Sequence, residues 1–409
     1  MRIAVLMAVT LTAAWPQTAW ISRPQPVDAR SFPLMGWNES PSDPEQLRLM
    51  KEAGLNISGF CRVQDLERVA RAGLTCVVDD KRANGFDWEK LPDDGVLRQQ
   101  VQELIRQTRS KTAVLGYLLR DEPSTDLMPG LGRMSAMLRE ADPKGLTYVN
   151  LFPTYASQAQ LGAATYEDYV NRFVKSVHPQ FLSYDNYSLL GGVMADRFFT
   201  NLDAIRRAAL GAGVPFWNCI LANAHFHYME PSDATLGLQV YSTLAYGGKG
   251  IQYFTYLTPN HGNFRLGAID QFGNRTATWD MLRRIDNQIA ALAPVMTKLK
   301  SLGVYHAPNV PDGCRPVSES RLVRGIDFGR ASGDPELGQY LVGEFEDPTG
   351  RPYLMIVNKD LTRSFPVVVH LKAEGKKMLY VSPYSGHEQA FEGEVTWIGP
   401  GAGILLRVE

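Results

Sequence analysis

Apolar residues follow two alternating patterns between Phe32 and Leu299. Short apolar runs that end in polar side chains are typical of parallel strands buried on both faces. The segments between them carry apolar residues at helical spacing, and Gly54 and Gly73 end two of these segments. The predicted strands cover Phe32–Trp37, Asn56–Cys61, Leu74–Val78, Thr112–Leu119, Leu146–Leu151, Gln180–Tyr184, Val214–Leu221 and Gly250–Tyr256.

Each predicted strand precedes a predicted helix, so the pattern contains eight strand–helix units. The helices are expected over Asp43–Ala53, Val63–Ala72, Val96–Thr108, Leu131–Glu140, Tyr166–Val177, Arg197–Leu210, Ala234–Tyr246 and Trp279–Leu299. Eight such units predict an α/β fold, a closed (β/α)8 barrel over residues 30–300 rather than an open doubly wound sheet.

The helical period ends after Leu299, and short strands separated by turn sequences such as Asp347–Gly350 replace it. This pattern predicts a small antiparallel β-sandwich domain over residues 301–409. Its strands are expected over Tyr340–Phe345, Tyr353–Val357, Phe365–His370, Met378–Val381 and Ile404–Val408.

The N-terminus has the pattern of a secretory signal peptide. Met1-Arg2 precedes a short apolar run over residues 3–14, with Ala14 or Ala19 at a possible cleavage site. That run is shorter than the about 20 apolar residues that span a bilayer. We expect a leader over residues 1–19, a secreted or periplasmic protein, and no membrane span in the mature chain.

Composition excludes some partners and leaves others open. The formal net charge is -1, which gives no basic face for nucleic acid. The spacing of Cys61, Cys76, Cys219 and Cys314 fits neither a zinc module nor a dense disulfide framework, so small buried side chains are expected there. We expect no cofactor.

The strand ends offer carboxylate, amide and aromatic groups, which are the groups that bind sugars. Active sites of such barrels lie at the carboxyl ends of the strands. Aromatic rings stack on the apolar faces of sugars, and cleavage of a glycosidic bond needs two carboxyl groups, one of them a general acid. The predicted substrate-binding residues are Trp37, Asn38, Asp80, Asn150, Tyr155, Tyr187, His225, His227, Glu230 and Tyr256.

Asp121-Glu122-Pro123 follows the fourth strand and carries the predicted acid. Asp121 and Pro123 could instead begin a helix, as a cap and a first-turn proline. Capping explains Asp121 but does not require a second acid, so Glu122 is the predicted general acid and Asp121 an orienting one. Burial at the mouth of a barrel raises the pKa of a carboxyl toward neutrality.

Asp185, at the end of the sixth strand, is the predicted partner carboxylate. An ordinary turn aspartate is the alternative interpretation, and Glu230 after the seventh strand is the rival acid. His225 and His227 would share one face of an extended segment and could bind a metal, although such a short pair indicates substrate binding or packing more often.

The segment Gly116–Pro123 resembles the fourth-strand acid/base motif of glycoside hydrolases of the β-galactosidase-like superfamily. Val149–Tyr155, Leu182–Tyr187 and Ala245–Tyr256 resemble segments of secreted barrel proteins in the same superfamily. The resemblance covers nearly the whole chain after the leader. It implies a (β/α)8 glycoside hydrolase that acts on a carbohydrate substrate.

Two positions depart from the superfamily pattern. Asp121-Glu122 stands where Asn-Glu is usual, and the seventh strand ends in Leu221–His225 without the usual nucleophilic glutamate, so that role is not transferred. The Tyr184-Asp185 pair is similar to chitinase-like barrels, where the substrate's acetamido group assists. Retention, inversion and substrate assistance stay open as mechanisms. Carboxyl groups about 5–5.5 Å apart indicate retention, and carboxyl groups about 6.5–9.5 Å apart indicate inversion.

Two other functions are the alternatives to a glycoside hydrolase. One is a catalytically degenerate carbohydrate-binding barrel, and the other is a metal-dependent hydrolase that uses His225 and His227.

Overall fold

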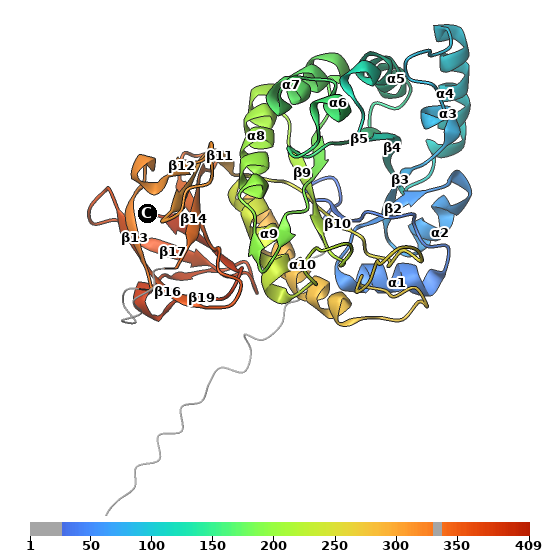
Figure 1. The fold of residues 1–409 in the computed structure, drawn as a ribbon. Helices are drawn as coiled ribbons and strands as arrows, with labels where there is room; N and C mark the ends of the chain where they lie inside the picture. Colours follow the sequence, from blue (N-terminus) through green and yellow to red (C-terminus); the bar gives the residue numbers. More distant parts are fainter. Residues whose placement is uncertain (1–26, 330–337) are drawn as a thin grey trace, which may run out of the picture.

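The computed structural model describes residues 27–329 and 338–409, and the predicted leader lies outside them. Eight parallel strands close into a barrel in the order β1-β10-β9-β6-β5-β4-β3-β2 (Figure 1). The strands are β1 Leu34–Gly36, β2 Ile57–Cys61, β3 Thr75–Val78, β4 Val114–Asp121, β5 Leu146–Leu151, β6 Leu182–Asp185, β9 Phe216–Leu221 and β10 Ile251–Phe254. The predicted barrel is confirmed, and each predicted strand overlaps an observed one.

Helices surround the barrel (Figure 1). They are α1 Pro44–Ala53, α2 Leu66–Arg71, α3 Lys81–Asn84, α4 Asp94–Thr108, α5 Met128–Ala141, α6 Gln158–Leu161, α7 Tyr166–Val177, α8 Arg197–Ala212, α9 Asp233–Ala245 and α10 Ala277–Met296. The short α3 and α6, and the hairpin of β7 Leu189–Leu190 with β8 Val193–Met194, lie in loops where no element was predicted.

Local sequence signals define helix ends. Asp43 caps α1, because its carboxylate accepts a hydrogen bond from the backbone N–H of Glu45 at 2.9 Å. The helix stops at Gly54, whose φ of 109° is open to glycine but costly for other residues. Leu47 and Met50 then face the core with no exposed surface, as their helical spacing predicts.

Two apolar layers hold the barrel together. The larger fills the space between the strands and the helices, and it contains Cys61 and Cys76 with their sulfur atoms 2.6 Å apart. The smaller fills the barrel interior, where the rings of Phe181 and Trp217 stack at 3.9 Å. Tyr148 closes this inner layer beneath the strand ends, so the barrel is packed and only its mouth is left for chemistry.

The C-terminal part is a β domain whose strand pairs are antiparallel except for β11 with β12. A sheet in the order β12-β11-β14-β15-β20-β17-β18 faces the small sheet β13-β16-β19 across an apolar core. The strands are β11 Lys300–Ala307, β12 Arg315–Pro316, β13 Val323–Phe328, β14 Tyr340–Glu346, β15 Pro352–Asn358, β16 Phe365–Leu371, β17 Met378–Val381, β18 Glu388–Ala390, β19 Trp397–Ile398 and β20 Gly403–Val408. Of these, β11, β12, β13, β18 and β19 were not predicted.

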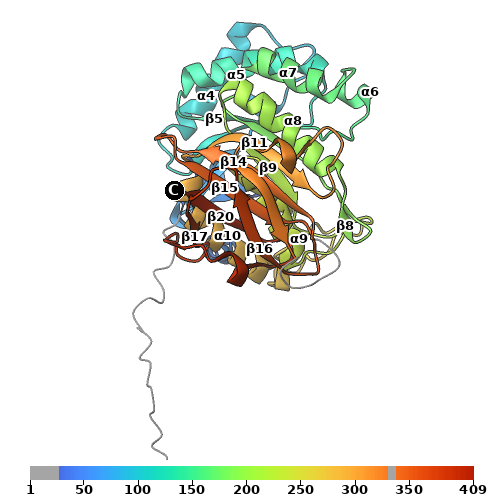
Figure 2. The same cartoon turned by 90° about the vertical axis from the view of Figure 1, so that its left-hand side faces the viewer.

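The β domain packs on α9 at the side of the barrel (Figure 2). This contact explains why the residues from Thr235 to Ala245 are all buried, unlike those of an ordinary barrel helix with one solvated face. The approach is close: a Cβ atom at Gly343 would lie 2.1 Å from the carbonyl oxygen of Ala245. The β domain therefore supports the barrel from its flank and leaves the mouth open.

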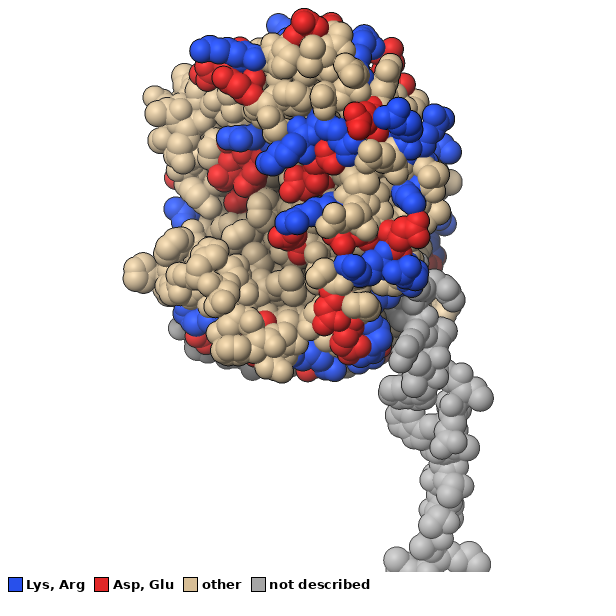
Figure 3. All heavy atoms as spheres, turned by 90° about the vertical axis from the view of Figure 1, so that its right-hand side faces the viewer, with Lys and Arg blue, Asp and Glu red and all other residues tan. Residues whose placement is uncertain are grey.

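Charged side chains on the outer face near α2 and α4 are mixed in sign (Figure 3). The pattern agrees with the small net charge and offers no basic surface on that face. Within the described residues, no helix combines the length and the hydropathy that a membrane span requires.

Candidate active site

Four predicted site residues come from three neighbouring strands. Asp121 ends β4, Glu122 follows it, Asn150 lies in β5 and Asp185 ends β6. Strand register sets Asp121 beside Asn150. Because neighbouring parallel strands end at one rim of the barrel, the three carboxyl groups meet there.

Asn150 links two of these carboxyl groups. Its amide nitrogen donates to Oδ1 of Asp121 at 3.2 Å and to Oδ1 of Asp185 at 2.8 Å. An amide nitrogen has two hydrogens, so both are used. Asn150 thus fixes the spacing of Asp121 and Asp185.

A buried network fixes the orientation of the Asn150 amide. Ser183 donates to Oδ1 of Asn150 at 2.8 Å, and Gln252 donates to Ser183 at 2.8 Å. Tyr148 donates to Gln252 and accepts from the indole N–H of Trp37 at 3.0 Å. Since each hydroxyl has one hydrogen to donate, this order leaves the nitrogen of Asn150 facing the carboxylates.

Glu122 is held in an uncommon backbone conformation. Its φ is 45°, in the left-handed region, and its backbone N–H donates to the carbonyl of Asn150 at 2.8 Å. The carbonyl of the next residue, Pro123, accepts from Tyr169 at 2.9 Å. Non-glycine residues in this region cluster at functional sites, because only surrounding contacts maintain the strain. No helix begins at Pro123; η2 begins at Thr125 and α5 at Met128, so the helix-start interpretation is wrong.

Burial and like charge favour the protonated form of these acids. Burial, with a smaller contribution from the charge of Asp121, raises the pKa of Glu122 to about 7. Burial also raises the pKa of Asp121, against the lowering effect of the hydrogen bond from Asn150. Asp185 is 6% exposed, and burial followed by the charges of Glu122 and Asp121 raises its pKa well above the usual range.

Solvent reaches Asp121 even though protein surrounds it on most sides. Glu122, next in the chain, is half-buried at the same rim. The rim therefore presents a protonatable carboxyl group to a molecule that enters from solvent.

Aromatic rings line the same rim. Tyr187 stacks on Phe254 with centroids 5.0 Å apart, and Trp37 lies 5.6 Å from the same ring. The hydroxyl of Tyr155 accepts from the backbone N–H of Tyr187 at 3.3 Å. The structure therefore brings the predicted Trp37 and Tyr187 together on one ring, Phe254, and Tyr155 joins them through the backbone of Tyr187.

Hydrogen bonds fix the tautomer of His225. Thr255 donates to the carbonyl of Leu257 at 2.5 Å, so it must accept from the amide nitrogen of Asn223 at 2.8 Å. Oδ1 of Asn223 then faces Nδ1 of His225 at 2.9 Å, and Nδ1 must donate. Burial, with the nearby charge of Arg265, lowers the pKa of His225 to about 4, which leaves a neutral ring with Nε2 as an acceptor.

The other histidine and the rival acid lie apart from this cluster. His225 is 4% exposed whereas His227 is exposed, because a turn at Phe226 replaces the expected extended segment. The two rings therefore do not share one face. Glu230 is exposed and pairs with Arg265 at 3.3 Å.

Three further predicted binding residues have structural roles. Tyr256 is fully buried in the layer between the barrel and the helices, so it does not line the mouth. Asp80 caps α3, and both of its oxygens bind Arg82. Asn38 links the end of β1 to the loop after β10 through the backbone N–H of Leu257.

The site also uses Phe254, Ser183 and Gln252, which the sequence interpretation did not select. Period-two alternation identifies Phe254, because it follows the inward-facing Gln252 by two positions. Tyr253, which lies between Gln252 and Phe254, points outward to α10 instead and donates to Asp286. In β6, Ser183 and Asp185 are also two positions apart, so both side chains point into the barrel.

No metal centre is apparent at this rim. Across residues 27–329 and 338–409, no group of three or more His, Cys, Asp or Glu side chains is arranged to hold a metal ion. The metal-dependent hypothesis therefore gains no support from the His225 and His227 pair.

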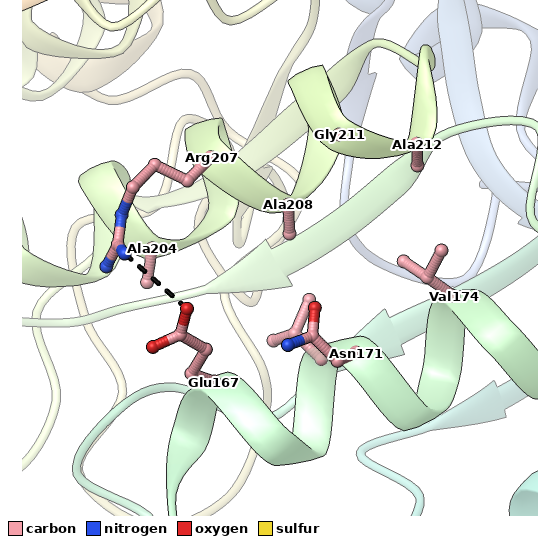
Figure 4. A pocket seen from close by; sticks show the side chains of 9 residues that line it. Glu167, Asn171, Val174, Ala204, Arg207, Ala208, Gly211 and Ala212 are labelled. Carbon is pink, nitrogen blue, oxygen red and sulfur yellow. Dashed lines mark ion pairs between the residues drawn. The ribbon is translucent and has the colours of Figure 1, made fainter.

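Two cavities lie away from this rim. One of about 320 Å³ lies between α7 and α8, where Arg207 pairs with Glu167 at 3.5 Å (Figure 4). Another of about 330 Å³ lies at the opposite end of the barrel, near Trp217 and Lys249. Neither contains a strand-end carboxylate, so the chemistry at the mouth, rather than cavity size, identifies the candidate site.

Solved structures share this architecture. Neither a protein-family model nor a curated protein matches the sequence. The structure resembles a catalytic mutant of Gan42B, a GH42 β-galactosidase from G. stearothermophilus, with a TM-score of 0.62 and 9% identity over 93% of this chain and 98% of that one. It also resembles a glycoside hydrolase family 5 protein from Bacteroides vulgatus, with a TM-score of 0.53 and 13% identity over 92% and 88%.

A third similar structure is a β-galactosidase from the psychrophilic Marinomonas ef1, with a TM-score of 0.50 and 11% identity over 66% of this chain. The chain spans only 62% of the length of that protein. At these identities the comparisons establish the fold alone: the protein has a (β/α)8 barrel, as these solved structures do, followed by a β-rich domain.

Proposed function

We propose that the protein is a glycoside hydrolase that cleaves O-glycosidic bonds of an oligo- or polysaccharide. The observation that carries the proposal is the carboxyl of Glu122, which lies at the carboxyl end of β4 with its pKa raised to about 7. A general acid must hold a proton at working pH and release it in the transition state, and a pKa near neutrality suits both. Glu122 protonates the leaving oxygen in this proposal.

Asp185 is the proposed partner carboxylate. Sugar cleavage passes through a state with positive charge on the ring. Burial raises the pKa of Asp185, and a positive charge that develops beside this carboxyl acts in the opposite direction, because it favours the ionised form. Asn150 then supplies the hydrogen bond that stabilises the carboxylate form.

Asp121 has a different proposed role. Its charge raises the pKa of Glu122, and its side chain binds Asn150 rather than the reacting atoms. Asp121 is therefore a positioning residue that keeps the acid protonated. Its own exposure to solvent lets it remain ionised more readily than Asp185.

The rings of Trp37 and Tyr187 support a carbohydrate substrate, since aromatic faces pack against the C–H faces of sugars. With its hydrogen on Nδ1, the neutral His225 has a free acceptor at Nε2, which suits a sugar hydroxyl. We also propose export through the leader over residues 1–19, which N-terminal sequencing of the mature protein would test.

Hydrolysis of a glycan panel by the wild type and by Glu122→Gln tests the proposal. The glutamine keeps the shape but cannot donate a carboxylic proton, so we expect turnover to fall by roughly 10²–10⁴ with the fold unchanged. Asp126→Asn, an exposed acid beyond the site, is the matched control. Wild-type activity in Glu122→Gln would end the assignment. The anomer of the product decides between retention and inversion.

A carbohydrate-binding barrel without catalysis is the second candidate. The end of β9 supports it, because Asn223 and His225 occupy that end and Glu230 is engaged by Arg265. Calorimetry against the same panel tests it. Binding that occurs without turnover would favour this candidate.

A further inference from the structure

The loops that follow β9 and β10 are joined at the barrel mouth. Ala224 and Arg265 exchange two backbone hydrogen bonds of 2.9 Å, like neighbours in an antiparallel ladder. The ion pair between Glu230 and Arg265 adds a contact between the same loops. We call residues 224–226 and 263–266 the joined loops; both follow strands whose carboxyl ends form the mouth (Figure 1).

The joined loops hold an aromatic ring, that of Phe226, exposed to solvent and in an unfavourable backbone conformation. Phe226 is 67% exposed, and its φ of 46° lies in the left-handed region that favours glycine. Asn263 holds this conformation: its Oδ1 accepts from the backbone N–H of Phe226 at 2.9 Å, and its Nδ2 donates to the carbonyl at 3.4 Å. Neither burial nor backbone preference explains phenylalanine here.

Aromatic contacts connect this ring to the site. Phe226 lies 5.2 Å from His225, and His225 stacks on Phe264 at 4.7 Å with 17° between the planes. His225 in turn lies 5.5 Å from Phe254, the ring that Trp37 and Tyr187 contact. The rings form a continuous series from the floor of the mouth to its rim.

We propose that Phe226, supported by Phe264 and the joined loops, is an outer sugar-binding subsite, so that the protein prefers carbohydrate chains to single-sugar glycosides. This inference rests on the proposed function and specifies its substrate. A sugar held at the strand ends leaves its neighbouring unit at the rim, where an exposed ring packs against a C–H face. The polar groups beside the ring, on Asn263, Arg265 and Glu230, suit the hydroxyls around that face.

A carbohydrate chain suits the exposed ring of Phe226 better than a protein partner does. Protein interfaces need a broad patch with a buried apolar centre. The joined loops expose two large apolar side chains, Phe226 and Leu266, beside Asn263 and the ion pair of Arg265 with Glu230. The continuity with the inner rings also places the occupant in line with the proposed cleavage site. We therefore infer that the two ends of the ring series bind parts of one molecule.

The test compares substrates of increasing length. Oligosaccharides from the panel and 4-nitrophenyl monosaccharides are hydrolysed by the wild type and by Phe226→Ala. We expect kcat/KM to fall roughly tenfold for the oligosaccharides and to stay unchanged for the monosaccharides, since one ring contact is lost. Phe272→Ala is the control, because Phe272 is 80% exposed on the loop after β10 but outside the joined loops. An equal effect of Phe226→Ala on both substrate classes, or none on either, overturns the subsite.

Two more variants separate binding from folding. Phe226→Gly removes the ring and the backbone strain together, so its Tm should equal or exceed that of the wild type while the oligosaccharide defect persists. Asn263→Asp keeps the acceptor for the backbone N–H of Phe226 and should retain more activity on chains than Asn263→Ala. A fully active Phe226→Gly contradicts the inference.

Failure of the hydrolase proposal gives a different result. If the wild type cleaves no substrate, calorimetry with the same oligosaccharides still measures the subsite. Oligosaccharide binding that weakens in Phe226→Ala but not in Phe272→Ala supports the subsite. In that case the protein binds the oligosaccharides of the panel without hydrolysing them. Equal binding by both variants, or no binding by the wild type, overturns the subsite.

Discussion

The amide nitrogen of Asn150 lies 2.8 Å from Oδ1 of Asp185 and uses its second hydrogen on Asp121. A side chain in β5 thereby sets the spacing between carboxyl groups on the two neighbouring strands. The network from Ser183 to Trp37 fixes which end of the amide faces them. Asn150 and its network therefore hold Asp121 and Asp185 in fixed positions beside Glu122.

Removal of the Asn150 amide should impair turnover. In Asn150→Ala, both Asp121 and Asp185 lose a hydrogen bond that lowers their pKa, so both should hold their protons to higher pH. A hydrogen bond to a charged group contributes about 1.5–3 kcal/mol, which predicts a loss of roughly 10- to 100-fold in kcat. Steady-state kinetics across pH, with Tm as a check on folding, measures this. An unchanged pH profile would show that Asn150 does not control these acids.

Asp121→Asn should shift the acid titration of Glu122 downward. The charge of Asp121 helps to raise the pKa of Glu122 to about 7, and asparagine has no charge. The basic limb of kcat/KM, which reports the free enzyme, should therefore move to lower pH. It should not reach the pH of an ordinary glutamate, because burial remains. A limb that stays in place or moves upward contradicts the assigned interaction.

Stability should depend on the same carboxyl. The pKa of Glu122 rises from 4.5 to about 7 on folding, so between these values the folded state binds more protons than the unfolded state. The free energy of unfolding then decreases as pH rises through this window. Relative to Glu122→Gln, the wild type should lose about 1–3 kcal/mol between pH 4.5 and 8. Denaturant unfolding at several pH values measures the difference, and a parallel pH dependence of the two proteins would argue against a buried acid.

His225 should stay neutral throughout the physiological range. Its pKa is lowered to about 4, and Asn223 keeps the hydrogen on Nδ1. Asn223→Asp replaces the amide with a carboxylate, which favours the imidazolium and should raise the pKa toward neutrality. Titration of the imidazole by NMR distinguishes the proteins. A wild-type ring that titrates near 6.5 would contradict the burial that the structure gives it.

The barrel was predictable from sequence because its signals repeat. Each strand is a short apolar run and each helix has its own spacing and end signal, as at Asp43 and Gly54, so an error in one element does not change the topology. The β domain was harder, because β12 and β19 have two residues each and carry little pattern. The contact between α9 and the β domain depends on tertiary packing, which no local pattern encodes.

The residues of the candidate site were largely predictable from the sequence, whereas the directions in which their side chains point were less so. The residues Glu122, Asp121, Asn150 and Asp185 follow from the rule that sites lie at strand ends. Tyr256 was misplaced because it belongs to the outer layer, whereas Phe254 faces inward. The turn at Phe226, which separates His225 from His227, has no glycine to announce it. Side chains beyond a strand end follow the loop backbone, which sequence periodicity does not determine.

The most direct measurement compares leaving groups in the wild type and Glu122→Gln. A substrate whose leaving group departs without protonation, such as a dinitrophenyl glycoside, needs no general acid. We predict that Glu122→Gln cleaves such a substrate with a kcat/KM near that of the wild type and that its kcat/KM on natural glycosidic bonds falls by roughly 10²–10⁴. Only the wild type should show a basic limb near pH 7. Equal rates of both proteins on the natural bonds, or the same basic limb in both, would contradict the assignment of Glu122 as the acid.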